Sequence, residues 1–321
     1  SRLSARCTGG KDQALIQNWR GRPALLITHG FVAAHTDGGT ALLGRGGSDT
    51  SAALLASRLN AECLEIWTDV PGLFSADPRD IPGARLLREL SYEEALEMAA
   101  SGAKVVHSRC IRAAADANMP IFVRDLSRPD FSGTAIRAYD TSGPAGAEGI
   151  RAVCRQPKMV VLLLQNLDTR EHVGFLAWVF AQISEAGISV DLVATSETTT
   201  TVALNRSSNL IDEAALDRLA EQLRERCSVV VYPDCSGINL VGRGARVALK
   251  EIDSGSGFFT DHPLLMLSQS ANDLCTSLLL HSGDARELLD ILHTSLIVNK
   301  TGPDIENGVF GPSWQEIQAD D

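Results

Sequence analysis

The sequence predicts an α/β protein in which a mostly parallel sheet is followed by two smaller units of one kind. Through residue 140, strand-like and helix-like segments alternate, which is typical of a parallel sheet with helices on both faces. Residues 141–149 (TSGPAGAEG) are small and rich in Gly and Pro, which predicts a linker. After the linker, a βαββαβ order is followed by a looser second copy, which predicts paired ferredoxin-like units.

Apolar runs and capping residues place the elements of the first part. Ser48 or Asp49 is the expected N-cap of the first helix, and Ser91 with Glu94 forms a capping-box pattern at the start of the second. The expected strands cover residues 24–28, 63–68 and 120–124, and the expected helices cover 49–61, 91–102 and 107–118.

The same reading divides the second part. The first copy has expected strands at 159–164, 189–195, 200–204 and 229–232, with helices at 173–186 and 212–226. The second copy has expected strands at 238–241, 264–268 and 274–280, a helix at 284–296, and a poorly patterned first helix around 243–251. The tail from Asn299 is rich in Gly and Pro, so we expect it to be loosely ordered.

Composition excludes several classes of protein. The 321 residues are 44% apolar and 21% charged, as in a globular protein, and the net charge of −11 argues against a nucleic-acid-binding surface. No apolar run is long enough to span a membrane, and the first residues lack a signal peptide and an initiator Met. The seven cysteines form no CxxC pair, and the histidines have no ligand spacing. We therefore expect a cytoplasmic protein with reduced thiols and no metal site, cut from a longer chain.

Three short segments could carry chemistry. Residues 43–50 (LGRGGSDT) lead into a helix, whose unpaired N–H groups can hold an anion, and Arg45 suits a carboxylate or phosphate. Residues 68–79 (TDVPGLFSADPR) follow a strand, where α/β proteins bind ligands. Residues 102–107 (GAKVVH) place Lys104 at a helix end. Taken singly, each segment is also consistent with an ordinary capped turn, a solvated loop or a favourable helix-end charge.

Taken together, these segments closely resemble the aspartate kinases of the amino-acid-kinase family. The matching stretches are LGRGGSDTSAALLA (43–56), IWTDVPGLFSADPR (66–79), SYEEALEMAASGAKVVH (91–107), MPIFVRD (119–125) and GTAI (133–136). Residues 173–197 resemble the family's paired ACT regulatory domains. The resemblance implies a carboxy-terminal, nucleotide-side part of an αβα kinase sandwich at 1–140, a linker at 141–157, ACT domains at 158–234 and 235–300, and a tail at 301–321.

The resemblance implies transfer of the ATP γ-phosphoryl group to the side-chain carboxylate of L-aspartate, with Mg²⁺, as the first step of lysine, threonine and methionine biosynthesis. The acceptor carboxylate is already ionised near neutral pH, so no general base is needed, and Asp49 is expected to orient a cationic group or metal. The implied catalytic residues are Asp49 and Ser48, and the implied substrate-binding residues are Arg45, Gly46, Gly47 and Ser48. The implied nucleotide-binding residues are Thr68, Asp69, Phe74, Arg79, Lys104 and Val105. Position 74 is commonly Tyr in the family, so one polar contact to the nucleotide is absent here.

The resemblance also implies feedback control by an amino acid and a homodimer formed through the ACT domains. The implied effector residues are Gly174, Phe175, Leu176, Ser189, Val190, Asp191, Thr195 and Glu197. Asp191 can bind an ammonium group, and helix-start N–H groups can bind a carboxylate. Asp168 and Glu171 add negative charge, which favours lysine over threonine as the effector.

The family's amino-terminal Lys-Phe-Gly-Gly-Thr-Ser-type segment does not occur in this sequence. Since that segment supplies a phosphate-binding Lys and much of the amino-acid pocket, we expect this chain alone to bind nucleotide weakly and not to turn over. An ACT-domain amino-acid sensor without catalysis is an alternative, although such subunits usually begin closer to the ACT domains. A kinase acting on acetylglutamate, glutamate or UMP is a further alternative, which the paired ACT units disfavour. Fusion of the parent protein to a second enzyme beyond Gly302 is also compatible with the resemblance.

Overall fold

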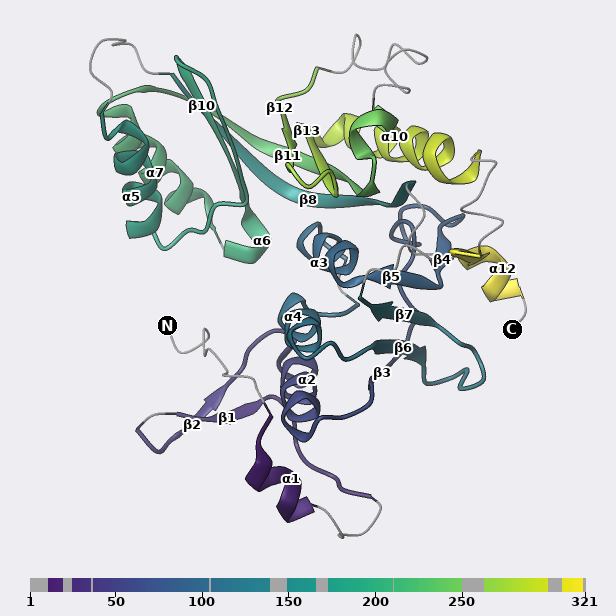
Figure 1. Cartoon of the computed structure of the whole chain (residues 1–321). Coiled ribbons are helices and arrows are strands. Elements are labelled where there is room, and N and C mark those ends of the chain that lie inside the picture. The colour runs from purple at the N-terminus through teal and green to yellow at the C-terminus, as the bar shows by residue number, and fades with distance from the viewer. Residues whose placement is uncertain are drawn as a thin grey trace. The chain divides into compact units, whose positions relative to one another are not determined.

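The chain divides into two compact units in the computed structural model (Figure 1), and each is described by itself. Unit 1 comprises residues 1–152 and 297–321, and unit 2 comprises residues 153–296. The structure describes residues 11–19, 25–35, 37–103, 105–138, 149–165, 173–209, 211–249, 263–299 and 308–319. Within these residues, no helix has the length and apolar character needed to cross a membrane.

Unit 1 is built on a four-stranded sheet in the order β3-β6-β7-β5. Its strands are β3 (Leu64–Thr68), β5 (Glu89–Ser91), β6 (Ile121–Asp125) and β7 (Thr134–Arg137). The β3–β6 and β5–β7 pairs are parallel, as expected, while β6 and β7 pair antiparallel. The β6 side chains alternate between buried and half-buried, and Ile121, Val123 and Ile136 form part of the core.

Helices α2 (Gly47–Leu59), α3 (Tyr92–Ala100) and α4 (Ser108–Asp116) accompany this sheet. The expected capping box of α3 is confirmed, because Ser91 Oγ accepts from the Glu94 N–H at 3.2 Å and the Glu94 carboxylate accepts from the Ser91 N–H at 2.9 Å. Helix α2 packs against α4 and β3, and the short α1 (Gln13–Trp19) packs against α2.

The expected strand at 24–28 does not form in its described part, residues 25–28. A two-stranded antiparallel ribbon of β1 (Val32–Ala34) and β2 (Thr40–Leu42) follows instead. Leu25 and Ile27 are 78% and 90% exposed. An apolar run becomes a buried strand only where neighbouring strands cover it, and none does so in the part of the chain described here.

Unit 2 contains one six-stranded sheet in the order β12-β13-β11-β8-β10-β9. Its strands are β8 (Gly149–Gln165), β9 (Leu192–Thr195), β10 (Thr199–Asn205), β11 (Ser228–Arg243), β12 (Met266–Gln269) and β13 (Cys275–His281). Because β8 and β11 are long, the two predicted βαββαβ copies share one continuous sheet. Strand β8 also begins inside the range expected as linker, of which residues 141–148 lie outside the described residues.

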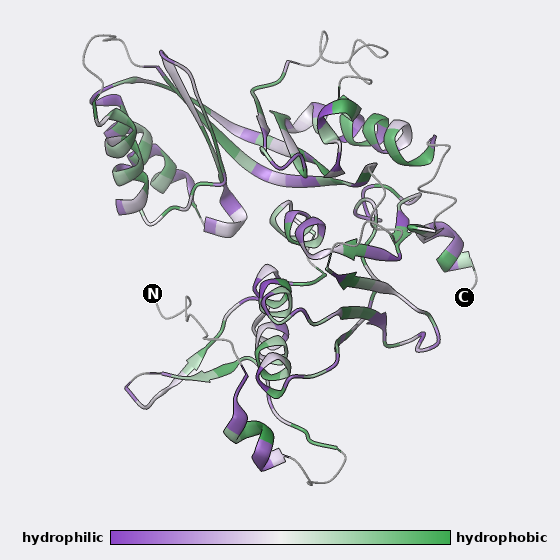
Figure 2. Cartoon of the chain, in the orientation of Figure 1, coloured by the Kyte–Doolittle hydropathy of each residue, from purple (hydrophilic) through white to green (hydrophobic). Residues whose placement is uncertain are grey.

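Helices α5 (Phe175–Glu185), α6 (Arg206–Asn209) and α7 (Glu213–Arg224) belong to the β8–β10 half of this sheet, and α10 (Ser282–His293) packs on β11 and β13 (Figure 1). Figure 2 shows hydrophobic and hydrophilic positions interleaved along α10, which buries Ala285, Leu288, Leu289 and Leu292. A second core cluster joins β8 and β10 to α5 and α7 through side chains such as Val160, Leu162, Val179, Val202 and Leu219.

The tail is more ordered than the sequence predicts. A π-helical turn covers Thr294–Val298, and β14 (Phe310–Ser313) pairs antiparallel with β4 (Arg85–Leu87) in unit 1. Helix α12 (Trp314–Ala319) follows directly. Phe310 and Ile317 are buried, so a few apolar side chains anchor a segment whose Gly and Pro content suggests a loose end. Residues 300–307 lie outside the described residues.

Candidate functional site

The glycine-rich segment forms a tight turn that starts α2. Gly46 has φ 64° and is the N-cap, so the expectation that Ser48 or Asp49 caps the helix is wrong. Both residues lie in the first helical turn, and no side chain caps this end. The left-handed conformation of Gly46 explains the difference, because it begins the helix two residues early. Unpaired N–H groups at such a helix start can bind a phosphate or carboxylate.

The start of α4 holds this turn in place. The Arg109 Nη2 atom donates to the carbonyl oxygens of Leu43 and Arg45, each at 2.9 Å. The His107 side chain lies so close to Gly46 that a Cβ placed there would be 2.4 Å from it. Any side chain at position 46 would therefore displace His107, in addition to the strain of the positive φ. The structure thus brings residues 45–49 and 105–109 together, as the matching motifs suggest.

Charges around this turn shift two titratable groups. Partial burial raises the pKa of Asp49, and a hydrogen bond from the His107 backbone N–H opposes that shift. Partial burial lowers the pKa of His107, and the nearby positive charges of Arg109 and Arg45 add to the effect. Asp49 is half-buried, while Arg45 is exposed and has no ion pair among the described residues.

The predicted nucleotide residues begin at the carboxyl end of β3. Thr68 is the last residue of β3, and its Oγ1 lies 3.1 Å from Asp69 Oδ1 on the surface. Only residues 60–63 separate α2 from β3, so the chain turns back sharply and α2 must start near the edge where β3 ends. Thr68, Asp69 and the glycine-rich turn therefore belong to one edge of the sheet.

Phe74 and Arg79 take part in other contacts. Phe74 is 7% exposed, and its ring meets that of Trp314 edge-on with centroids 5.5 Å apart. Arg79 is exposed and pairs with Asp77 at 2.6 Å. Val105 is half-buried just before α4, and Lys104 lies outside the described residues.

Sequence reasoning missed three residues of this region, namely His107 as a packing group, Arg109 and Trp314. His107 lies inside a matched motif, so its position was available but not its contact with Gly46. Arg109 is separated from Leu43 by 66 residues, and no local pattern reveals so distant a hydrogen bond. Trp314 was placed in a tail expected to be loose, although a lone large aromatic in such a segment is a usable signal of burial.

Some of the predicted effector residues in unit 2 line one hollow of about 180 Å³. Its lining consists of Phe175, Leu176, Thr195, Ser196, Glu197, Thr198, Thr199 and Thr200. Gly174, with φ 91°, starts α5 beside this lining. The other candidates have different partners: Ser189 bonds Asn209 at 2.7 Å, Asp191 accepts from the Asn205 N–H at 2.8 Å, and Val190 packs against the apolar core. Asp168 and Glu171 lie outside the described residues.

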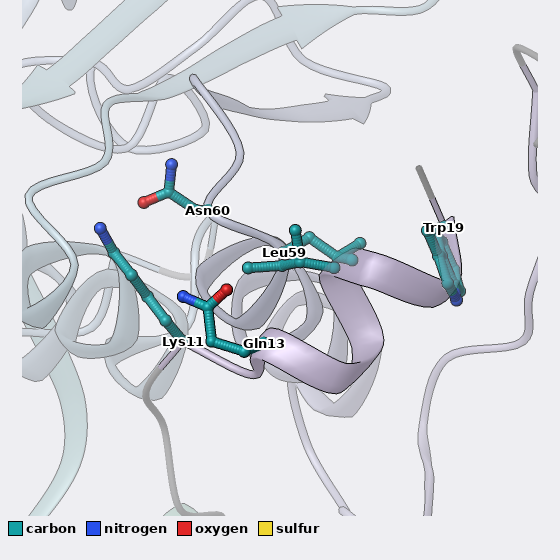
Figure 3. Close-up of a pocket in the computed structure, with 6 residues that line it drawn as sticks. Lys11, Gln13, Trp19, Leu59 and Asn60 are labelled. Carbon is teal, nitrogen blue, oxygen red and sulfur yellow. The ribbon is translucent and has the colours of Figure 1, made fainter. Parts of the chain in front are cut away.

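A larger hollow of about 430 Å³ lies between α1 and the end of α2. Figure 3 shows its lining by Lys11, Gln13, Trp19, Leu59 and Asn60. No motif predicts this hollow. Within the described residues, no three His, Cys, Asp or Glu side chains lie close enough together to hold a metal ion.

Comparison with known proteins gives a consistent result. Residues 5–125 match the amino acid kinase family. Lysine-sensitive aspartokinase 3 of Escherichia coli is 33% identical over 274 residues, which are 85% of this chain and 60% of the relative. The chain thus spans about three-fifths of the length of that relative.

Solved structures of E. coli aspartokinase III have the same fold. The complex with aspartate and ADP has a TM-score of 0.71 at 32% identity and covers 83% of this chain and 59% of that one. The complex with lysine and aspartate has a TM-score of 0.70 at 32% identity, and the match covers 89% of this chain and 62% of that one. The chain therefore contains part of an amino acid kinase domain in residues 5–125, and over most of its length it resembles the aspartokinases of that family.

Proposed function

We propose that this chain is part of an aspartate kinase, which transfers the γ-phosphoryl group of ATP to the side-chain carboxylate of L-aspartate and gives 4-phospho-L-aspartate. This reaction is the first step of lysine, threonine and methionine biosynthesis, and we place it in the cytoplasm. The observation that supports the proposal best is the uncapped start of α2 beside an exposed Arg45, in a chain 33% identical to an aspartokinase. The solved relative that binds aspartate and ADP supports the same substrates.

The chemistry places few demands on the protein. The aspartate side chain has a pKa of about 3.9 in water, so it attacks as a carboxylate without a general base. Catalysis then depends on positioning and on neutralising phosphoryl charge, and Mg²⁺ arrives with ATP as part of the substrate. Arg45 binds a carboxylate of aspartate, and Ser48 and the Gly46–Gly47 backbone contact it from the first turn of α2. Asp49, in the same helical turn, orients a cationic group or the metal.

The nucleotide occupies the edge where β3 ends. Thr68 ends β3 and Asp69 follows it, while Arg79 is exposed and Val105 is half-buried, so their side chains are accessible; they and Lys104 are proposed from the sequence. The Phe74 ring packs against Trp314, so we propose that Phe74 supports the loop that binds the nucleotide by packing.

The chain alone is expected to bind nucleotide weakly and not to turn over. The sequence has no Lys-Phe-Gly-Gly-Thr-Ser-type segment, and loss of charge-stabilising groups typically costs orders of magnitude in rate. The whole activity therefore belongs to a protein that also contains the part of the aspartokinases that this chain does not span.

We propose that an amino-acid effector binds the hollow of about 180 Å³ in unit 2 and that unit 2 forms a homodimer. Glu197 provides negative charge for an ammonium group, and the start of α5 at Gly174 provides N–H groups for a carboxylate. This arrangement favours lysine over threonine, and a solved relative binds lysine.

An amino-acid sensor without catalysis is the second candidate, because unit 2 offers this hollow whether or not unit 1 binds substrates. Isothermal titration calorimetry with L-aspartate, Mg-ADP, L-lysine and L-threonine separates the two. A kinase part predicts that Arg45→Ala weakens L-aspartate binding at least tenfold and leaves L-lysine binding unchanged, since a charge-assisted hydrogen bond contributes about 1.5–3 kcal/mol. The control is Arg112→Ala, an exposed arginine of α4. L-lysine binding without any L-aspartate binding, even after addition of the part of an aspartokinase that this chain does not span, supports the sensor. Equal or tighter L-threonine binding contradicts the effector assignment.

A further inference from the structure

We infer that Arg109 is a positioning residue that holds the glycine-rich turn so that the Arg45 side chain faces a ligand. The inference rests on the proposed function, in which Arg45 binds a carboxylate. Nothing in the sequence motifs points to Arg109, which lies in α4, 66 residues from Leu43 along the chain. Its role follows from the contacts that Arg109 and its neighbour His107 make with the turn.

The first contact is the guanidinium of Arg109. One nitrogen, Nη2, donates to the carbonyl oxygens of both Leu43 and Arg45 at 2.9 Å, and it has one hydrogen for each. These carbonyls flank Gly44, whose φ of 72° bends the chain between them. Donors with a full charge make stronger hydrogen bonds than neutral ones, so this bend is held at both sides.

A further contact comes from His107. Its side chain fills the space beside Gly46 where a Cβ would stand. The His107 Nδ1 in turn accepts from the Arg109 N–H at 3.2 Å. Residues 107 and 109 thus contact the turn just before the N-cap of α2 and at the N-cap itself.

This arrangement fixes the backbone of Arg45 and leaves its side chain to solvent. The Arg109 guanidinium is occupied by two carbonyl oxygens, so it does not compete for a ligand, whereas Arg45 is exposed and unpaired in the described part of the chain. A ligand that binds a preordered turn does not have to order it, and the affinity is correspondingly higher. Arg109 therefore acts on a carboxylate ligand only through Arg45.

A purely structural role for Arg109 would be to join α4 to α2, which pack together through buried groups such as Ala53 and Ile111. The two roles predict that loss of the Arg109 side chain increases backbone mobility in different segments. Loss of a positioning contact loosens residues 43–50 and leaves the sheet intact. Loss of a structural contact lowers protection throughout α4 and the neighbouring strand β6.

Amide hydrogen exchange of the full chain without ligand tests the difference. The reporters are the Gly47 N–H, bonded to the Gly44 carbonyl, and the Thr50 N–H, bonded to the Gly46 carbonyl, each at 3.0 Å. We expect Arg109→Ala to speed exchange of both about tenfold and to leave β6 unchanged. Arg112→Ala, an exposed arginine one turn further along α4, should change neither. Arg109→Lys should restore part of the protection, and added methylguanidinium should restore it in Arg109→Ala. Unchanged exchange of Gly47 and Thr50, or an equal rise in β6, overturns the inference.

Titration of the same variants with L-aspartate separates this inference from the proposed function. We expect Arg109→Ala to weaken L-aspartate binding about tenfold, with recovery in methylguanidinium, and Arg45→Ala to abolish both the binding and the recovery. If the unmodified chain binds no L-aspartate even with the remaining part of an aspartokinase added, while the exchange results are as expected, the proposed substrate is wrong and the contact of Arg109 with the turn stands. If L-aspartate binds equally to the chain and to Arg109→Ala, Arg109 does not position Arg45.

Discussion

His107 lies between charges of both signs, and its titration reports on the turn. Its pKa is lowered by burial and by Arg109 and Arg45, and Asp49 opposes the shift. The ring is therefore neutral at pH 7 and takes up a proton below its usual pKa of about 6.5. Since the unfolded chain binds that proton at higher pH, this group costs stability as the pH falls through about 6.5.

Removal of the Arg109 charge should raise the pKa of His107. Arg109→Ala takes away a nearby positive charge and keeps the backbone N–H that donates to Nδ1. NMR titration of the His107 ring protons measures the shift, and Arg112→Ala serves as the matched loss of one arginine from α4. A His107 pKa that stays constant or falls in Arg109→Ala would contradict the electrostatic account of this site.

Phe74 has a packing role besides its predicted place at the nucleotide. It is 7% exposed and packs edge-on against Trp314. We expect Phe74→Ala to lower the free energy of unfolding by about 3 kcal/mol, through lost burial and a cavity. Urea denaturation measures this loss, and Leu126→Ala, at a side chain 72% exposed, should change it by about 0.5 kcal/mol or less. A loss for Phe74→Ala as small as that of the control would mean that the tail does not cover this ring.

Among the elements, α3 and β8 are joined by an ion pair with no solvent exposure. Glu94 Oε1 lies 3.3 Å from Arg151 Nε, and the other carboxylate oxygen of Glu94 completes the capping box. Glu94→Gln keeps an acceptor for the cap but removes the charge opposite Arg151. We expect it to cost about 3 kcal/mol of unfolding free energy, because the buried Arg151 guanidinium loses the carboxylate charge that Glu94 provides.

Two further variants test this account of the buried pair. Glu93→Gln, at an exposed position in the same first turn, should cost only a few tenths of a kcal/mol, about what the helix dipole contributes. The double variant Glu94→Leu with Arg151→Met should recover most of the loss, because apolar side chains can replace a buried pair. Chemical denaturation of the unmodified chain, the two single variants and the double variant measures their free energies of unfolding. If Glu94→Gln leaves the free energy of unfolding unchanged, the pair does not stabilise the fold.

The hollow between α5 and the β9–β10 turn allows a separate test of the proposed effector site through Glu197. Glu197→Gln should weaken L-lysine binding several-fold and affect L-threonine much less, because only lysine carries a second ammonium group. Glu185→Gln, at the exposed end of α5, is the matched control. Calorimetry of the unmodified chain and the two variants measures these affinities. If Glu197→Gln binds L-lysine as tightly as the unmodified chain, Glu197 does not bind the effector.

Local patterns predicted well those elements whose signals are local. The capping box at Ser91 is a sequence signature that the structure confirms, and the helix expected at 212–226 forms as α7, with Asp212 as its N-cap. The strand expected at 24–28 fails because strand formation depends on neighbours that an apolar run cannot specify. The early start of α2 was missed because a left-handed glycine competes with Ser and Asp as a helix start. The motifs predict the candidate site at the glycine-rich turn, which remains a prediction, and no local pattern points to Arg109 and Trp314, whose partners are distant in sequence.

At the scale of the whole molecule, part of an amino acid kinase domain is followed by a unit built on a six-stranded sheet. Strand β8 starts within unit 1 and continues into unit 2. The chain spans 60% of lysine-sensitive aspartokinase 3, and the proposed catalysis needs the remainder.

An aspartyl-hydroxamate assay tests this central claim most directly. The chain is given Mg-ATP, L-aspartate and hydroxylamine, alone and together with a polypeptide comprising the part of E. coli aspartokinase 3 that it does not span, beside the intact E. coli enzyme as control. Our account predicts no product above the blank from the chain alone, and aspartyl hydroxamate from the mixture that disappears with Arg45→Ala. Product from the chain alone, or a mixture that remains at the blank while both polypeptides are folded and associated, would contradict it.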